Sequence, residues 1–206
     1  MNRNYVSALA GALFCLLATN LSFGQIVFDE ANDGELSNNG ATPTALTFNL
    51  GANTIVGSFG SNGQSGANNG NDADVFTFNL GPNLIVDSIS TTRDGTARSF
   101  FGYSNSATAT LASDNTNNFD AGGLFANGES ATASLSTFDP ASGLSPIESV
   151  LPLGSGDHSF FFQETAAGEF NYSVTFNVVS SVPEPSSTAL LILGLAGVAT
   201  RRRKRA

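Results

Sequence analysis

The sequence predicts an all-β domain, an antiparallel β-sandwich placed between two terminal targeting segments. Short runs rich in Val, Ile, Phe and Thr recur between clusters of Gly, Asn, Asp and Ser, and no long stretch between residues 25 and 180 shows helical periodicity. Several runs alternate apolar and polar residues, which gives a strand one face for a core and one for solvent. Two sheets that bury their apolar faces against each other form a sandwich.

The runs and the turns between them predict about eight to ten strands. The strand candidates are 44–50, 53–59, 73–80, 84–90, 98–103, 148–153, 157–163 and 170–179. The first two flank Gly51-Ala52 and are interpreted as a hairpin. Residues 113–129 are rich in Asn, Asp and Gly and are expected to form a long loop with a buried patch at Leu124 and Phe125. The phenylalanines are expected to pack in the core, because exposed aromatic platforms for sugars usually use Trp or Tyr and this chain has no Trp.

The N-terminus is typical of a secretory signal peptide over residues 1–24. Arg3 supplies the positive end, an apolar stretch runs from about Val6 to Ala18, and the small residues Ser22 and Gly24 precede the expected cleavage point. The apolar stretch is shorter than the roughly 20 residues of a membrane span. Cys15, the single cysteine, lies inside it, so the mature chain is expected to contain no thiol and no disulfide.

The C-terminus, 181–206, has three parts in a fixed order. Pro183, Glu184 and Pro185 come first, and an uncharged apolar segment over about 187–200 follows. A basic cluster then closes the chain at Arg201, Arg202, Arg203, Lys204 and Arg205. This order predicts a stop-transfer transmembrane helix whose basic end stays in the cytoplasm. The apolar segment is short for the roughly 30 Å bilayer core, which suits a temporary anchor.

These three parts resemble the PEP-CTERM sorting signal of Gram-negative bacteria. The resemblance implies that an exosortase, a membrane cysteine protease, recognises Pro183-Glu184-Pro185 and cuts at or near them. It also implies an exported protein that begins as an inner-membrane-anchored precursor and then moves to the cell surface, the outer envelope or the extracellular matrix. Signal peptidase, the export machinery and exopolysaccharide are the further partners that it implies. An ordinary single-pass tail anchor is the alternative.

The charge of the central segment excludes nucleic acid as a partner. Residues 25–180 contain 16 acidic residues against only Arg93 and Arg98, so their net charge is −14. A domain this acidic cannot bind a polyanion by releasing its counterions. Divalent cations remain possible ligands.

The order of features in this segment also resembles the bacterial pre-peptidase C-terminal domain, a jelly-roll-like β-sandwich. The matching residues are Glu30, Asn32 and Asp33, the strand Asp72-Ala73-Asp74-Val75-Phe76-Thr77-Phe78, and two closing runs at 156–160 and 172–176. Some members of that family bind calcium through the N-terminal acidic segment and the Asp-x-Asp turn. The resemblance therefore implies a calcium site built from Glu30, Asn32, Asp33, Asp72 and Asp74. Ordinary turn formation by Asn and Asp side chains explains the same residues without a metal.

No pattern in the sequence points to catalysis. His158 is the only histidine, no G-x-S-x-G or G-x-x-x-x-G-K-[ST] motif occurs, and no cysteine remains for a zinc site. We therefore expect a non-catalytic protein with a structural or adhesive role. The alternatives are a calcium-dependent module that binds glycan or protein and a hydrolase that uses paired carboxylates to cleave polysaccharide.

Overall fold

The structure is a computed structural model, and it describes residues 24–61, 72–94, 99–109, 119–124, 132–134, 144–164 and 168–182. The β-domain spans Phe23–Ser181. The expected signal peptide and the expected C-terminal helix lie outside the described residues. Within the described part of the chain, no helix has both the length and the apolar character needed to cross a bilayer.

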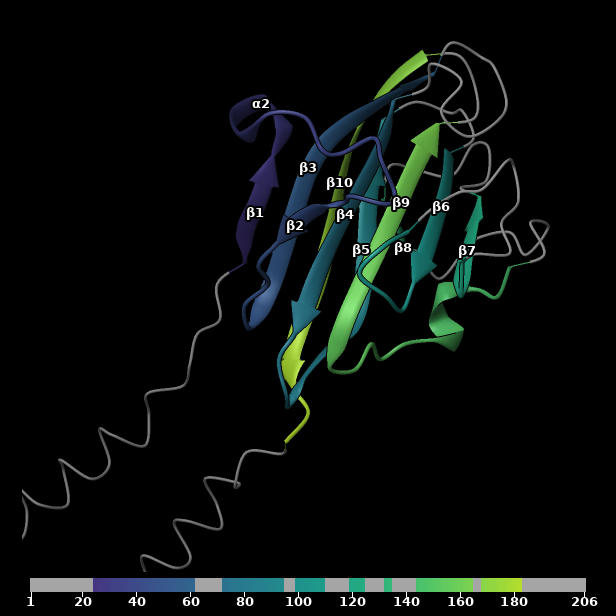
Figure 1. The fold of residues 1–206 in the computed structure, drawn as a ribbon. Helices are drawn as coiled ribbons and strands as arrows, with labels where there is room; N and C mark the ends of the chain where they lie inside the picture. The colour runs from purple at the N-terminus through teal and green to yellow at the C-terminus, as the bar shows by residue number, and fades with distance from the viewer. Residues whose placement is uncertain are drawn as a thin grey trace, which may run out of the picture. The chain divides into compact units, whose positions relative to one another are not determined.

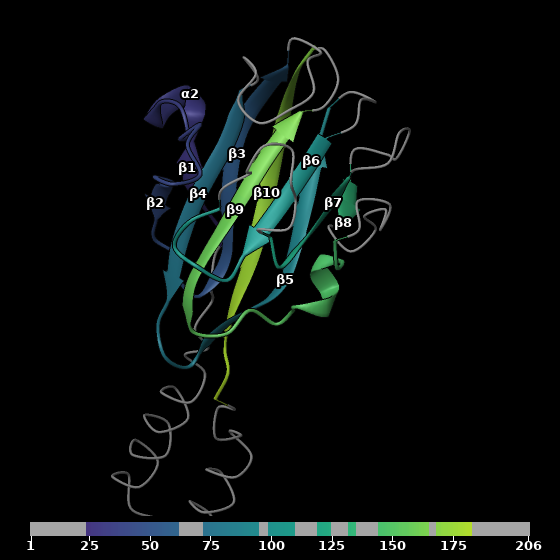
Figure 2. The ribbon, with the colours of Figure 1, turned by 45° about the vertical axis from the view of Figure 1, so that its right-hand side comes forward.

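The described residues form two five-stranded sheets, which confirms the prediction of an all-β sandwich (Figures 1 and 2). Sheet A has the order β1-β3-β10-β5-β8, and its strands are β1 (Gln25–Asp29), β3 (Gly51–Ser61), β10 (Gly168–Ser180), β5 (Leu84–Arg93) and β8 (Thr132–Ser134). Sheet B has the order β2-β4-β9-β6-β7, and its strands are β2 (Thr44–Leu46), β4 (Ala73–Leu80), β9 (Gly156–Glu164), β6 (Ser99–Ser104) and β7 (Ala121–Leu124). A short helix, α2 (Glu30–Asp33), follows β1, and a 3₁₀ turn, η4 (Ile147–Ser149), precedes β9.

The sheets are mixed rather than purely antiparallel. β1 runs parallel to β3 and β2 runs parallel to β4, each at the edge of its sheet, whereas the other pairs are antiparallel. Five strands lie at or within a few residues of the predicted ranges: 73–80, 84–93, 99–104, 156–164 and 168–180. The candidate at 148–153 was wrong, because η4 and an isolated bridge at Leu153 occupy it.

The predicted hairpin around Gly51 was also wrong, because β2 belongs to sheet B and β3 to sheet A. Asn53 explains the crossing between them. Its buried amide donates to the carbonyl oxygens of Asn49 at 2.7 Å and Gly51 at 2.9 Å, and its side-chain oxygen accepts from the Asn49 amide at 2.9 Å. These bonds hold an open loop that carries the chain from one sheet to the other, so the two strands do not pair.

Phenylalanine side chains fill the space between the sheets, as predicted. Phe76 and Phe78 of β4 and Phe160 of β9 stack in one layer with interplanar angles of 12–15°. Phe176 of β10 in sheet A meets all three rings edge-on, with centroids 5.0–5.9 Å away. Edge-to-face pairs of this kind add to the stabilisation from burial alone.

A second apolar cluster covers the outer face of sheet B. It consists of Ala73, Val75, Phe100, Ala109, Phe119 and Phe161, with Leu144 packed against it. Because β4 and β9 are thus covered on both faces, most of their described side chains are buried, whereas β10 alternates between buried and exposed positions. The alternation that the sequence shows over residues 73–80 is therefore not matched by alternating burial in β4.

Candidate functional site

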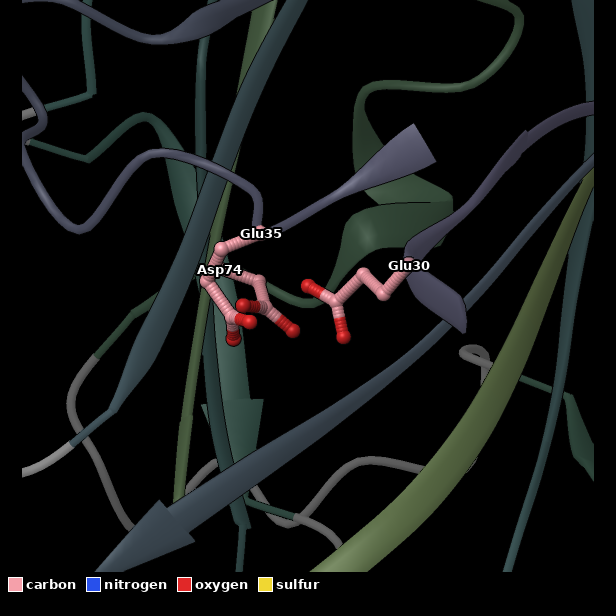
Figure 3. A group of neighbouring side chains, drawn as sticks. All are labelled: Glu30, Glu35 and Asp74. Carbon is pink, nitrogen blue, oxygen red and sulfur yellow. The ribbon is translucent and has the colours of Figure 1, made fainter. Parts of the chain in front are cut away.

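Carboxylate groups from three parts of the chain meet at one place on the sandwich. Glu30 comes from the start of α2, Glu35 from the loop after it, and Asp74 from the start of β4. One carboxylate oxygen of each lies within 4.8 Å of the others, and Figure 3 shows the three groups pointing toward one another. The fold thus brings two residues of the predicted calcium set, Glu30 and Asp74, into a common site.

Glu30 is held in place by two backbone amides. Its Oε2 accepts from the Ser58 amide at 2.6 Å, and its Oε1 accepts from the Leu36 amide at 3.2 Å. The pairing of β1 with β3 stops at Asp29 and Val56. Beyond that point the Ser58 amide of β3 has no β1 partner, and it donates to the side chain of Glu30 instead. A carboxylate fixed in this way is preorganised as a ligand.

Gly57 of β3 leaves the space through which Glu30 reaches its neighbours. A Cβ atom at position 57 would lie 2.8 Å from Oε2 of Glu30 and 2.9 Å from the hydroxyl oxygen of Tyr172. Real Cβ atoms do not approach other atoms so closely, so any larger residue would displace one of these groups. The lack of a side chain at Gly57, which we call the glycine cradle, therefore leaves room for both groups.

Asp74 lies at the inner end of the site and is fully buried. Neither of its carboxylate oxygens accepts a hydrogen bond of normal geometry in the described part of the chain. Burial raises the pKa of Asp74 well above its usual value, the charge of Glu30 raises it further, and the nearby Tyr172 hydroxyl acts in the opposite direction. A buried carboxylate that accepts no hydrogen bond of normal geometry from the described residues is costly, which makes this position a candidate for an ion.

Asp72 and Glu35 form the outer rim of the same site. Burial raises the pKa of Asp72, although the side chains of Asn38 and Glu35 lower it in part. Burial likewise raises the pKa of Glu35, with Glu30 and Asp72 adding to the effect. The neighbours that shift these pKa values are acidic, amide or phenolic.

Asn32 and Asp33, also predicted as ligands, are engaged elsewhere. Asp29 caps α2 by accepting from the Ala31 amide at 3.1 Å, and its other oxygen accepts from Asn32 Nδ2 at 2.6 Å. Asp33 Oδ2 accepts from the Asp29 amide at 2.8 Å, and this residue lines an open groove of about 470 Å³ between β1 and residues 44–49. Both side chains therefore serve the local turn, which is the alternative that the sequence left open.

Glu35 was missed from sequence, although one signal pointed to it. Gly34 has a φ of 92°, a left-handed conformation that glycine adopts without strain. It reverses the chain directly after α2, so that Glu35 faces back toward Glu30. In the sequence, Gly34 between Glu30 and Glu35 indicates a chain reversal that can bring the two acidic side chains together. It does not indicate that Asp74 of β4 joins them.

The oxygen ligands of this cluster fit a calcium ion. Calcium takes six to eight oxygens, mostly from carboxylates, in flexible geometry. Glu30, Glu35, Asp72 and Asp74 supply only oxygen, and no soft ligand is present among them. The structural observation that agrees with an ion here is the buried carboxylate of Asp74, which accepts no hydrogen bond of normal geometry from the described residues.

Replacing Gly57 with alanine is expected to destabilise the protein by about 1–3 kcal/mol, the usual cost of forcing atoms into a packed site. Gly60 on the same strand is the matched control, because its Cβ would make only ordinary contacts at 3.8 Å with Asp72 and Gly168. Urea unfolding of both variants measures the difference. Equal urea midpoints for Gly57→Ala and Gly60→Ala would contradict the close packing of Glu30 and Tyr172 against Gly57.

Comparison with known proteins identifies the end of the chain. Residues 181–204 match the model of the PEP-CTERM protein-sorting motif. The chain carries this motif, and the match supports an exported protein that an exosortase-type membrane protease processes. The motif residues Pro183–Pro185 and the basic cluster 201–205 lie outside the described residues.

A similar solved structure is the pre-peptidase C-terminal domain of collagenase from Bacillus anthracis, with 20% identity and a TM-score of 0.36. The match covers 66% of this chain and 97% of that one. A comparison with curated proteins gives no match.

Proposed function

We propose that this chain is an exported, non-catalytic β-sandwich protein with a structural role at the cell surface or in the extracellular matrix, and that calcium completes its fold. Residues 1–24 are the signal peptide, 25–180 the sandwich and 181–206 the sorting signal. The observation that carries the calcium part is the burial of Asp74 among the carboxylates of Glu30 and Glu35.

A cation at this cluster would join three separate parts of the domain. Glu30 and Glu35 belong to the N-terminal segment, Asp74 belongs to sheet B, and the cradle at Gly57 belongs to sheet A. Binding energy at the ion would therefore hold the N-terminal segment against both sheets. Extracellular modules commonly bind calcium with dissociation constants of about 10⁻⁴–10⁻³ M, which suits a protein that meets calcium only after export.

The state of His158 supports a non-catalytic role. Its ring is buried between the sheets, and both of its nitrogens make hydrogen bonds within the protein, to Tyr103 and Gly154. It has no free face with which to act as a general base on a substrate.

An adhesive role is the second candidate, and the outer face of sheet A favours it. Thr54, Thr175 and Ser90 form one row across β3, β10 and β5, and Ser173 and Thr92 extend the next. This face presents hydroxyl groups, whereas the outer face of sheet B is covered by its own apolar cluster. Binding on a glycan array that disappears on mutation of Thr175 and Ser90 would establish it.

Sorting is tested by the intact mass of the protein recovered from membrane, surface and medium fractions of the producing cells. The proposal predicts a species that begins near Gln25, ends near 182–185 and lies outside the inner membrane. A species that still ends at Ala206 and stays in the inner membrane would contradict sorting. Mutation of Glu184 to Ala, with Glu148→Ala as the control, is expected to retain the longer form.

A further inference from the structure

The β-domain begins and ends toward the same end of sheet A. Gln25 at the start of β1 pairs with Asn53, and Val178 near the end of β10 pairs with Gly51 at the start of β3. Because β1 runs parallel to β3 and β10 runs antiparallel to it, β1 starts at the end of the sandwich where β10 finishes (Figures 1 and 2). We call this the exit end, and it consists of residues 49–51, 81–84, 154–156 and 180–181.

The turn between β4 and β5 fastens the last residues of β10 at the exit end. Ser180 pairs with Leu84, and the Ser181 amide donates to the carbonyl oxygen of Asn83 at 2.8 Å. Asn83 has a φ of 68°, a left-handed conformation that asparagine tolerates in turns, and the Leu84 amide closes this turn by donating to the Gly81 carbonyl at 3.3 Å. The chain is therefore held in sheet A up to Ser181.

The sorting motif follows this attachment almost immediately. Pro183 comes two residues after Ser181 in the sequence, and Pro185 comes four residues after it. An extended chain covers at most about 3.6 Å per residue, so the motif lies within roughly 7–14 Å of Ser181 whatever path the chain takes. A protease encloses several residues around the bond that it cuts. An enzyme that binds this motif therefore meets the exit end of the folded domain.

Exposed apolar side chains fall on the segments that enter and leave the exit end. In the described part of the chain, three large apolar side chains have at least half of their surface exposed: Ile26 at 63%, Leu50 at 53% and Val182 at 51%. Leu50 belongs to the exit end, Ile26 is the second residue of β1, and Val182 is the first residue after the β-domain. The open groove of about 470 Å³ beside β1 reaches this end at Gln25 and Asn49. Exposed apolar groups that share one region, rather than scatter singly, mark a surface that binds another molecule.

We propose that the exit end is the docking face for the membrane protease that removes the sorting tail, an inference that rests on the sorting proposed above. The protease contacts Leu50 and the turn at 81–83 while its cleft holds the residues after Ser181. A bilayer surface fits this face less well, because residues 25–180 carry a net charge of −14 and anionic headgroups repel them.

Docking at the exit end leaves the carboxylate cluster accessible. Asp74 lies near the start of β4, whereas Leu80, six residues later, pairs with Gly156 of the exit end. Six residues span about 20 Å of strand. The face that meets the protease and the site proposed for calcium consequently lie toward opposite ends of the sandwich.

Photo-crosslinking in the producing cells tests the docking face. A photoreactive amino acid replaces Leu50 of the full-length chain, and Thr92, an exposed residue of β5 that pairs with Ser173, is the control position. Ser173 precedes Ser180 by seven residues, or about 23 Å of strand. Cells in which the catalytic cysteine of the membrane protease is substituted should accumulate the bound precursor. We expect an adduct with that protease from position 50 and none from position 92. An adduct with lipid alone would assign the face to the bilayer and overturn the proposal, as would equal adducts, or none, from the two positions.

The rate of processing gives a second test. Leu50→Ser should slow the appearance of the species that ends near 182–185 by about five- to tenfold, because it removes an apolar side chain from the interface. Leu50→Met keeps the apolar contact and should be processed at the wild-type rate. Pulse labelling followed by intact mass measures both rates, and thermal unfolding checks that both variants fold.

Glu184→Ala separates the docking face from sorting itself. If Glu184→Ala blocks processing while Leu50→Ser is processed at the wild-type rate, the docking face is wrong and sorting stands. If the wild-type chain keeps its tail, as Glu184→Ala does, sorting is wrong and the docking face falls with it.

Discussion

Replacing Asp74 with asparagine is expected to stabilise the calcium-free protein and to abolish its response to calcium. The variant removes a buried carboxylate that lies beside Glu30 and that accepts no hydrogen bond of normal geometry. Relief of such a group is worth on the order of 1–3 kcal/mol at pH 7. In the wild type, calcium at one hundred times its dissociation constant should instead add about 2.7 kcal/mol. Thermal unfolding with calcium and with a chelator measures both effects.

The stability difference between Asp74→Asn and the wild type should also depend on pH. The folded pKa of Asp74 is raised, so the folded state binds its proton more tightly than the unfolded state. The stability that this proton contributes is present below the unfolded pKa and is lost as the pH rises through the folded pKa. The gain of Asp74→Asn over the wild type should therefore be larger at pH 7 than at pH 4. Asp157→Asn, which removes an exposed carboxylate that accepts from Asn79 at 2.6 Å, should alter neither the calcium response nor its pH dependence.

Replacing Phe160 with alanine is expected to cost about 3–5 kcal/mol, as for other fully buried aromatic residues. Phe160 is fully buried, and its ring contacts Phe76 and Phe78 of β4, Tyr103 of β6 and Phe176 of the opposite sheet. Its loss would leave a cavity between the sheets at their centre. Phe160→Leu keeps most of the volume and should cost clearly less. Urea unfolding that finds both variants equal to the wild type would contradict the packing.

Most strands of the sandwich could be predicted because the apolar pattern that marks a strand is visible in its own residues. Residues 168–180 alternate between buried and exposed positions, and period-2 alternation is a local property of sequence. β1, β7 and β8, by contrast, were missed because they are short edge strands whose identity depends on the partners β3, β6 and β5. The prediction of a loop over residues 113–129 was therefore wrong at 121–124, which form β7. The assignment of neighbouring strands to different sheets was also missed at Gly51, because a single side chain, Asn53, determines the loop there.

The candidate site could be predicted only in part. The resemblance of the sequence motifs to the pre-peptidase C-terminal domain indicated Glu30, Asp72 and Asp74, and the fold brings these together. Asn32 and Asp33 were equally plausible by type, but the capping of α2 uses them, and capping depends on the local backbone. The role of Gly57 could not be predicted from sequence, because it depends on the side chains of Glu30 and Tyr172 filling the space beside it in the fold.

Calorimetric titration of calcium into the full-length protein in detergent tests the central claim most directly. The account predicts a saturable heat at calcium concentrations up to the millimolar range, which disappears in Asp74→Asn and persists in Asp157→Asn. Absence of any heat in the wild type, together with a thermal midpoint that a chelator leaves unchanged, would contradict it.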